Sequence, residues 1–347
     1  MGKILTLGIE TSCDETSVSI VEDGRNVLCN VISSQIETHR KFGGVVPEVA
    51  SRMHLESINN IIKEAFNQAK LNFSDIDTVG VTKGPGLIGA LLVGISAGKA
   101  ISTALNIPLI GVNHMRGHIC AAYITHKELE PPFIALVVSG GHTYIVNVMG
   151  YCDFKVMGRT RDDAVGESFD KVARSLNLSY PGGPEIDRLA KLGDPTSIDF
   201  PRIFLENNSY DFSLSGLKTS VLNYLNQQAQ KKQEIVKENV CASFQAAVMD
   251  VLEEKTKRAL KETGLKKLVI SGGVASNSEL RKRFQDISEK MNIKTYFPDR
   301  ILCTDNGAMI ASSAYYEYLN NNISDLYLNI PYSFLKPCFK ALSTSLL

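Results

Sequence analysis

The sequence contains one structural plan twice, and this repetition limits the folds that the chain can adopt. In the first copy, strands predicted over residues 4–9 and 16–21 flank a short polar turn. In the second copy, strands predicted over residues 133–138 and 143–148 flank a similar turn. Internal similarity of this kind predicts a duplicated α/β unit that binds its ligand between the two halves.

Each half also supplies a buried strand, a glycine turn and a helical segment. The first glycine turn comprises residues 83–86 and precedes a small-residue helix predicted over residues 87–105. The second comprises residues 271–273 and precedes the segment 274–284. Together with residues 139–141, these turns can present backbone N–H groups to a phosphate. None of them has the Gly-Lys-Ser/Thr ending of a P-loop, and a dinucleotide-binding fingerprint is lacking.

Hairpin-first α/β halves of this kind resemble the actin, sugar kinase and Hsp70 superfamily. We therefore expect an α/β protein with two actin-like lobes, each ribonuclease-H-like, and a cleft between them. A chain of 347 residues exceeds the usual size of one core, which predicts lobes over residues 1–130 and 131–347. The second lobe is expected to carry a helical insertion over about residues 186–263, and the last helix to pack back on the first lobe.

Composition narrows the environment in which the protein works. Lys+Arg and Asp+Glu both total 37, so RNA binding needs a local patch or a partner rather than a general field. The seven cysteines are scattered without a C-x-x-C pair, which indicates a reducing compartment. We expect no signal peptide, because the acidic Glu10 comes too early. Residues 87–112 are not expected to span a membrane, because Lys99 and Pro108 interrupt them. The expected location is cytoplasmic.

The pair His114 and His118 is the strongest indication of a metal site. Residues four apart lie on one face of a helix, so both imidazoles can reach one metal. The motif is not H-E-x-x-H, because Met115 stands where a zinc peptidase has its water-activating glutamate. His142 or the turn that contains Asp305 could complete the site, and spacing alone does not choose between them. The three other histidines show no pattern and are expected at the surface: His39, His54 and His126.

Four acidic residues are candidates for a ligand site. Asp14 and Glu15 follow the first strand, where two carboxylates can face a cleft. Asp170 closes a charge-rich segment over residues 158–171, and Asp187 follows a loop rich in proline and glycine. These two aspartates are candidates to hold ribose hydroxyls. The alternative is a solvated helix with ion pairs four residues apart.

Taken together, these motifs resemble one family from about residue 4 to residue 320: the universal tRNA threonylcarbamoyltransferases (TsaD in bacteria), once labelled O-sialoglycoprotein endopeptidases. The motifs that carry the resemblance are residues 8–16 (GIETSCDET), His114 with His118, residues 138–142 (VSGGH), 167–171 (ESFDK), 180–184 (YPGGP), 212–219 (FSLSGLKT), 272–277 (GGVASN) and 303–307 (CTDNG).

The resemblance implies a function, a cofactor and partners. The implied reaction moves threonylcarbamoyl from threonylcarbamoyl-AMP to N6 of the adenosine beside the anticodon, in tRNAs that read codons starting with A, and releases AMP. One divalent metal per subunit is implied on His114, His118 and Asp305, with Fe(II) favoured and zinc as the alternative. The residues implied to hold the adenylate are Val138, Ser139, Gly140, Gly141, His142, Asp170, Gly183, Asp187 and Asn277. The implied partners are a TsaB-like paralogous subunit and a TsaE-like P-loop ATPase, and no membrane is involved.

The transfer reaction requires a general base, and the residues present distinguish this reaction from three alternative functions. An adenine amine is a poor nucleophile, so Asp14, supported by Glu15, is the candidate to take its proton. The main alternative is an ATP-dependent kinase or ATPase of the same superfamily, which leaves the histidine pair unexplained. A metallopeptidase would need the missing glutamate. A non-catalytic scaffold would predict loss of the metal histidines and of Asn277, which are present.

Overall fold

The computed structural model describes residues 2–205 and 209–331, and the chain divides into two compact units. The first unit is formed by Met1–Gln35, Val46–Gly117 and Asn306–Leu347. The second unit is formed by Ile36–Val45 and His118–Asp305. Each unit contains a five-stranded mixed sheet, with strand orders β3-β2-β1-β4-β5 and β10-β9-β6-β7-β8. The two sheets therefore have the same connectivity, as the repeated sequence plan predicts.

The first sheet begins with an antiparallel meander and continues with parallel strands. Its strands are β1 (Leu5–Glu10), β2 (Glu15–Glu22), β3 (Asn26–Ser34), β4 (Thr78–Gly84) and β5 (Leu109–Asn113). β2 pairs antiparallel with β1 and β3, whereas β4 runs parallel to β1 and β5. Each strand predicted for this half overlaps an observed strand. The carboxyl ends of β1, β4 and β5 consequently meet at one edge of the sheet.

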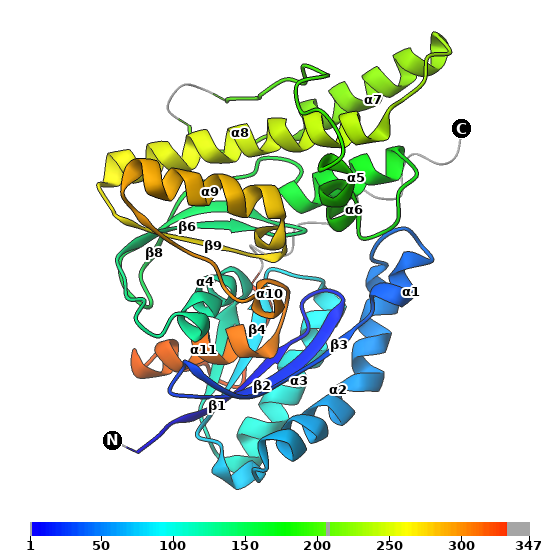
Figure 1. The fold of residues 1–347 in the computed structure, drawn as a ribbon. Helices are drawn as coiled ribbons and strands as arrows, with labels where there is room; N and C mark the ends of the chain where they lie inside the picture. The colour runs from blue at the N-terminus through cyan, green and yellow to red at the C-terminus, as the bar shows by residue number, and fades with distance from the viewer. Residues whose placement is uncertain (1, 206–208, 332–347) are drawn as a thin grey trace. The chain divides into compact units, whose positions relative to one another are not determined.

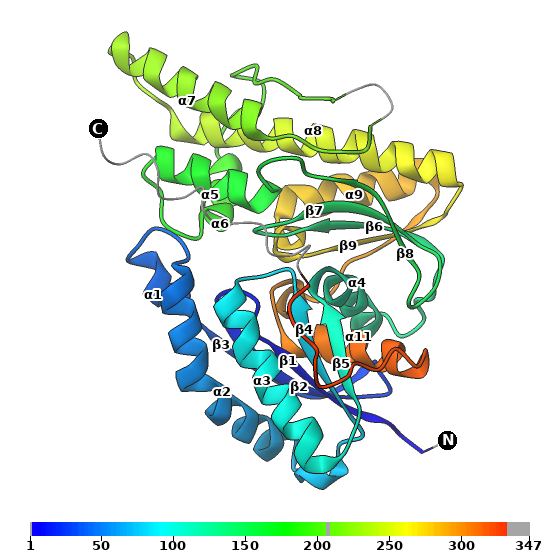
Figure 2. The same cartoon turned by 180° about the vertical axis from the view of Figure 1, so that it is seen from behind.

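The two faces of the first sheet are covered differently. Helices α2 (Pro47–Ala69) and α3 (Ile88–Leu105) lie on one face, and α11 (Gly307–Leu319) lies on the other (Figures 1 and 2). Leu7 and Ile9 of β1 point into the apolar core formed with α2 and α3. Gly8 lies between them and faces α11, where an added Cβ would come within 2.2 Å of the Gly307 carbonyl oxygen. The alternation of side chains along β1 thus brings α11 backbone directly onto the sheet.

Helix α3 is the most apolar element of the first unit. Among the described residues, it is the one helix whose length and composition would suffice to cross a membrane. Its buried residues Leu91 and Ile95 belong to the core shared with the sheet and α2. An added Cβ at Gly98 would lie 2.2 Å from the Val81 side chain, so the helix packs tightly on β4. These contacts are those of a core helix.

The second sheet repeats this arrangement with a larger helical cover. Its strands are β6 (Phe133–Val138), β7 (Thr143–Val148), β8 (Phe154–Arg159), β9 (Lys267–Ser271) and β10 (Lys294–Tyr296). The helical segments of this unit are α1 (Ile36–Arg40), α5 (Val165–Ser175), α6 (Gly182–Ala190), α7 (Ser215–Gln230), α8 (Lys237–Thr263), η2 (Gly273–Ser276), α9 (Ser278–Met291) and α10 (Arg300–Cys303). α4 (His114–Thr125) belongs to it from His118 on. The helical insertion predicted from about residue 186 contains α7 and α8.

Apolar side chains on both faces of β6 hold the second unit together. Ile134 and Leu136 face the large core on the side of α5 and α8, where the rings of Phe169 and Phe244 lie 5.1 Å apart. Phe133 is not part of this core, and its ring contacts that of Tyr123 on α4, with the centroids 6.0 Å apart. β6 is buried on both faces, as expected for a central strand with an unbroken apolar sequence.

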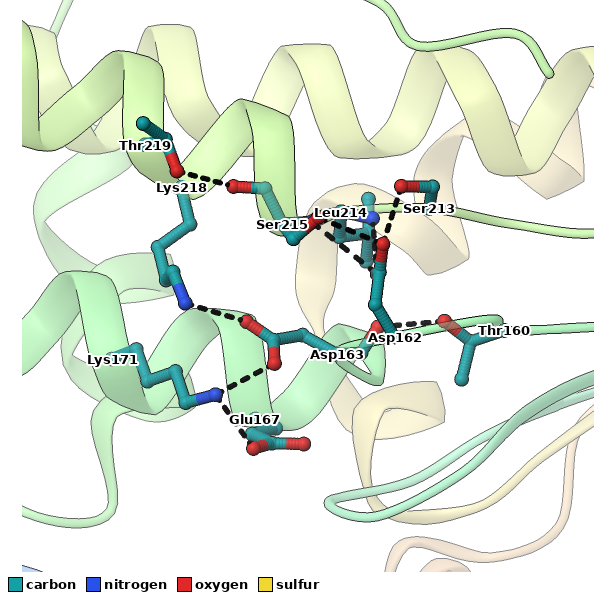
Figure 3. A network of polar contacts seen from close by, with 10 residues as sticks. All are labelled: Thr160, Asp162, Asp163, Glu167, Lys171, Ser213, Leu214, Ser215, Lys218 and Thr219. Atoms are coloured by element: carbon teal, nitrogen blue, oxygen red, sulfur yellow. Dashed lines mark hydrogen bonds and ion pairs between the residues drawn. The ribbon is translucent and has the colours of Figure 1, made fainter. Parts of the chain in front are cut away.

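Two adjacent aspartates join the charge-rich segment before α5 to the start of α7 (Figure 3). Asp162 accepts hydrogen bonds from the hydroxyls of Ser213 and Ser215 and from the backbone N–H groups of Leu214 and Ser215. It therefore satisfies N–H groups that α7 leaves open at its first turn. Burial raises the pKa of Asp162, but these four hydrogen bonds outweigh it and hold the net pKa below the usual aspartate value.

Asp163 completes this network with ion pairs. Its carboxylate lies 2.6 Å from Lys171 Nζ of α5 and 3.0 Å from Lys218 Nζ of α7. Lys171 also pairs with Glu167, one turn earlier on α5. The segment 158–171 and the motif 212–219 are therefore tied to each other by charged and polar side chains (Figure 3).

Replacing Asp162 with asparagine should change the pH dependence of stability. The folded-state pKa is depressed, so Asp162 contributes its full stabilisation above its unfolded-state pKa of about 3.9 and loses it as the pH falls through the lower folded-state value. Between about pH 6 and about pH 3.5, the native chain should lose more unfolding free energy than Asp162→Asn, because the amide does not titrate. Urea denaturation at several pH values measures this difference.

The exposed Asp286 on α9 provides a matched control, since Asp286→Asn removes a carboxylate outside the network. A stability profile of Asp162→Asn that runs parallel to the native one would show that the cap does not act through its charge.

Candidate active site

The two predicted metal histidines begin helix α4. β5 ends at Asn113, whose side-chain oxygen accepts a hydrogen bond from Met115 N and fixes the first turn of the helix. His114 and His118 follow one turn apart, and both side chains are buried. Their rings therefore point to the same side of α4, as the spacing predicts.

Asp305 lies close to the two histidines. Its Oδ1 lies 3.3 Å from His118 Nε2, and one potential ligand atom from each of His114, His118 and Asp305 lies within 4.8 Å of the other two. Over residues 2–205 and 209–331, this is the one group of three such side chains. His142, the alternative left open by spacing, lies instead in the turn after β6, where its carbonyl accepts from Ser139 N. The donor set of two imidazoles and one carboxylate suits Fe(II) or zinc.

A buried carboxylate that the sequence did not single out lies beside His114. Glu10 was expected in a polar turn, but β1 continues through it and its side chain is fully buried. Its Oε2 is 3.1 Å from His114 Nδ1 and accepts a hydrogen bond from the Thr82 hydroxyl at 2.6 Å. Its Oε1 accepts from Ser12 N, and the Ser12 hydroxyl is 3.2 Å from His114 Nδ1. An acidic residue at the end of an otherwise apolar strand is the signal that could have identified it.

The candidate base lies in the short turn between β1 and β2. Asp14 and Glu15 are both partly exposed, and β2 begins at Glu15. The carbonyl of Asp14 accepts from Gln35 N, and the Ser34 hydroxyl is 3.5 Å from the Glu15 carboxylate. The carboxylates are thus held at the carboxyl end of β1, on a backbone fixed by neighbouring β-structure.

The prediction that His39, His54 and His126 lie at the surface is wrong for two of them. His39 and His54 are fully buried, and His126 is half-buried with its Nε2 donating to the Phe297 carbonyl. A single histidine carries no periodic signal, so burial against neighbouring elements could not be read from spacing.

His54 connects α2 to the turn that bears Asp14. Its Nε2 donates to the Cys13 carbonyl at 2.9 Å, and its Nδ1 is 2.7 Å from the Thr16 hydroxyl. The Thr16 hydroxyl is in turn 3.0 Å from the Ser57 hydroxyl, also on α2. These bonds hold both ends of the residue 13–16 turn.

The residues implied to hold the adenylate come from four segments of the second unit that are linked by hydrogen bonds. The turn after β6 accepts from the start of α5, through Gly166 N to the Ser139 carbonyl and Glu167 N to the Gly140 carbonyl. Asp170 of α5 then accepts from Gly182 N at the start of α6.

The same linkage continues from α6 to α9 and back to β6. Asp187 of α6 accepts from the N–H and hydroxyl of Ser278, which begins α9. Asn277 accepts from Leu280 N and donates to the Gln245 side chain. An added Cβ at Gly272 would lie 2.3 Å from the Val138 carbonyl oxygen, so the glycine turn after β9 touches the end of β6. The structure therefore brings these predicted residues into one neighbourhood.

Four glycines in these segments face open space. An added Cβ at Gly140, Gly141, Gly183 or Gly273 would meet no atom within 4 Å. None of the four has a positive φ, so neither packing nor backbone conformation requires glycine there. A further reason for glycine at a position is that a ligand approaches the backbone closely, and this reason applies to these four positions.

The repeated sheets and the buried histidine–carboxylate group define an actin-like α/β protein with a candidate metal site. Solved structures support the fold class. HypF of T. kodakarensis has a TM-score of 0.62 at 15% identity, over 91% of this chain and 48% of that chain. Full-length HypF in a phosphate- and nucleotide-bound form has a TM-score of 0.60 at 15% identity, over 90% and 55%. At this identity the likeness concerns the fold alone.

Sequence comparison gives the family. Residues 26–312 match the family described as TsaD, tRNA N6-adenosine threonylcarbamoyltransferase. A protein of that description from Clostridioides difficile (strain 630) is 56% identical over 329 residues, 95% of this chain and 97% of the relative. Another from Clostridium beijerinckii is 54% identical over the same shares. The chain belongs to this family and is a transferase that modifies N6 of adenosine in tRNA; the kinase or ATPase alternative is not favoured.

Replacing His54 with leucine should destabilise the chain by about 1–3 kcal/mol, because the Cys13 carbonyl and the Thr16 hydroxyl lose a buried hydrogen-bond partner. Urea unfolding followed by circular dichroism measures this loss. Glu56→Gln, an exposed change on the same helix, should stay within about 0.5 kcal/mol of the native chain. Equal stability of His54→Leu and Glu56→Gln would contradict the structural role.

Proposed function

We propose that the chain takes threonylcarbamoyl from threonylcarbamoyl-AMP, delivers it to N6 of the adenosine beside the anticodon in tRNAs that read codons starting with A, and releases AMP. The observation that carries this proposal is the set of open glycines among the linked segments of the second unit. Backbone exposed without side chains fits a ligand that is held by N–H groups, as a phosphate is.

In this proposal the adenylate lies against the second unit. Gly140, Gly141 and Gly183 let its phosphate approach the backbone, and their N–H groups stabilise charge on the departing AMP. Asp170 and Asp187 each already accept from a helix N-terminus. Asp187 also pairs with Lys191 at 3.5 Å, and the carboxylates of Asp170 and Asp187 are the proposed partners of the ribose hydroxyls. Val138, Ser139, His142 and Asn277 complete the proposed contacts.

The proposed reaction also needs a proton acceptor. The lone pair of an adenine amine is delocalised into the ring, so the enzyme must orient the amine and remove its proton as the new N–C bond forms. Asp14 is the proposed general base and Glu15 supports it, a role that typically contributes ~10²–10⁴-fold in rate. The fixed backbone of their turn would hold the carboxylates in place without reorganisation during the reaction.

His114, His118 and Asp305 would hold one divalent metal, with Fe(II) favoured and zinc as the alternative. When bound, the metal would supply Lewis-acid polarisation and an anchor for the threonylcarbamoyl end of the substrate. Three protein ligands leave coordination positions for that substrate.

RNA binding must come from local features, because the chain has no net charge. Residues 281–283 are a run of three basic residues, but Arg283 pairs with Asp250 and Glu279, and Arg281 donates to the Ala275 and Pro298 carbonyls. These bonds argue against a main role for them in tRNA binding. We propose that tRNA binding involves partners, namely a TsaB-like paralogue and a TsaE-like P-loop ATPase, in the cytoplasm and away from membranes.

A protein partner on the first unit is supported by exposed apolar side chains. Leu55 of α2 is 64% exposed, and Ile88 and Leu92 of α3 are 50% and 44% exposed. Leu55 and Leu92 line the same surface hollow, and contiguous exposed apolar side chains mark a protein-binding face.

Replacing Gly141 with alanine should weaken adenylate binding without lowering stability. The new methyl group enters open space, so the fold is unaffected, but it occupies the proposed ligand position. We expect kcat/KM for threonylcarbamoyl-AMP to fall by about tenfold, equivalent to about 1.4 kcal/mol. Gly150→Ala, in the turn after β7 of the same sheet, is the matched control and should leave the kinetics unchanged. Identical kinetics for both variants would place the ligand elsewhere.

Transfer of label from radioactive threonine to unmodified tRNA tests the reaction and the metal site together. The mixture contains an adenylate-forming enzyme, bicarbonate, ATP, the two proposed partners and either the native chain or His114→Ala. The native chain should label one adenosine and the variant should label little, because one of three metal ligands is lost. Equal labelling would remove the metal role, and no labelling in the presence of adenylate and active partners would contradict the proposed reaction.

A further inference from the structure

The buried carboxylate of Glu10 has no role in the reaction described above. It lies at the carboxyl end of β1 with 0% of its side chain exposed. Removing a carboxylate from water costs several kcal/mol unless hydrogen bonds and charge compensate. A buried acid at this position therefore requires an explanation from the groups that surround it.

Three hydrogen-bond donors surround Glu10 and come from three segments. Ser12 N binds Oε1, and the Thr82 hydroxyl at the end of β4 binds Oε2. His114 Nδ1 at the start of α4 lies 3.1 Å from Oε2. A carboxylate only accepts hydrogen bonds, so the imidazole must carry its proton on Nδ1 to use this contact.

We infer that Glu10 is a positioning residue for the metal site: it holds the proton of His114 on Nδ1 and so presents Nε2 for coordination. The inference rests on the proposed metal site. A metal ligand must offer a nitrogen lone pair, and the hydrogen bond on the other ring nitrogen sets which nitrogen that is. Glu10 also accepts a hydrogen bond from Ser12 N. The same carboxylate therefore orients the His114 ring and fixes the start of the turn that leads to Asp14.

Replacement of Glu10 by glutamine shows why the charge matters. An amide offers one accepting oxygen and one donating NH2 group, whereas Ser12 N and His114 Nδ1–H both need acceptors on different carboxylate oxygens. If the NH2 group faces Ser12, two donors oppose each other. If it faces His114, Nδ1 must accept and the proton moves to Nε2, the nitrogen that should bind metal. Either arrangement weakens the site.

Cobalt(II) titration of the metal-free full chain, followed by visible absorption, tests the inference. Glu10→Gln should bind cobalt about 10–100-fold more weakly than the native chain, the loss typical when a partner of a metal-bound histidine is removed. Thr82→Val is the matched control, because it removes a Glu10 contact without touching His114, and it should retain native affinity within about threefold. Thermal unfolding of the metal-free chains compares their stability.

The outcomes separate this inference from the metal site itself. Native affinity in Glu10→Gln, with binding lost in His114→Ala, would overturn the role of Glu10 and leave the site intact. If Glu10→Gln and Thr82→Val lose the same cobalt affinity, the loss reflects a general disturbance of the pocket, and the role of Glu10 is overturned. Equal cobalt binding by the native chain and His114→Ala would overturn the proposed site together with the inference.

The native chain provides a test that does not depend on Glu10→Gln folding. The ring ¹⁵N shifts of His114, assigned by comparison with His114→Ala, report its tautomer in the metal-free state. A proton on Nδ1 supports the role of Glu10, and a proton on Nε2 overturns it.

Discussion

The first unit depends on a close contact between α11 and the sheet that two glycines permit. Helix α11 reaches the sheet at Gly8, where any side chain would collide with the Gly307 carbonyl, and at Gly80, where an added Cβ would lie 2.4 Å from Ala314 Cβ. Asp305 precedes this helix by two residues, and Glu10 follows Gly8 by two. Along the chain, both acidic residues therefore lie within two residues of the close contact between α11 and β1.

Three polar side chains proposed to bind the adenylate also form hydrogen bonds that stabilise the starts of helices. Asp170, Asp187 and Asn277 each accept a hydrogen bond from the N-terminus of a helix or the residue beside it. These bonds immobilise the side chains before any ligand arrives, so little conformational entropy remains to be lost on binding. The same feature makes the residues hard to replace without disturbing the helices, and an alanine scan alone would not separate the two effects.

The sequence predicted the local features well because they depend on short spacings. Strands over residues 133–138 and 143–148 follow from unbroken or alternating apolar residues, and the shared face of His114 and His118 follows from helical geometry. The third member of the histidine group was undetermined between His142 and Asp305, because folding brings it in from a distant part of the chain. Burial of Glu10 and His54 was missed for the same reason: the donors that make it tolerable lie on other strands and helices.

The matching strand orders of the two sheets allow their turns to be compared position by position. Each sheet has a turn between its first two strands at the same place in the topology. The first sheet carries Asp14 and Glu15 in this turn, whereas the second carries Gly140 and Gly141. Two equivalent turns thus carry opposite chemistry, one with carboxylates and one without side chains, although the strands around them are connected in the same way.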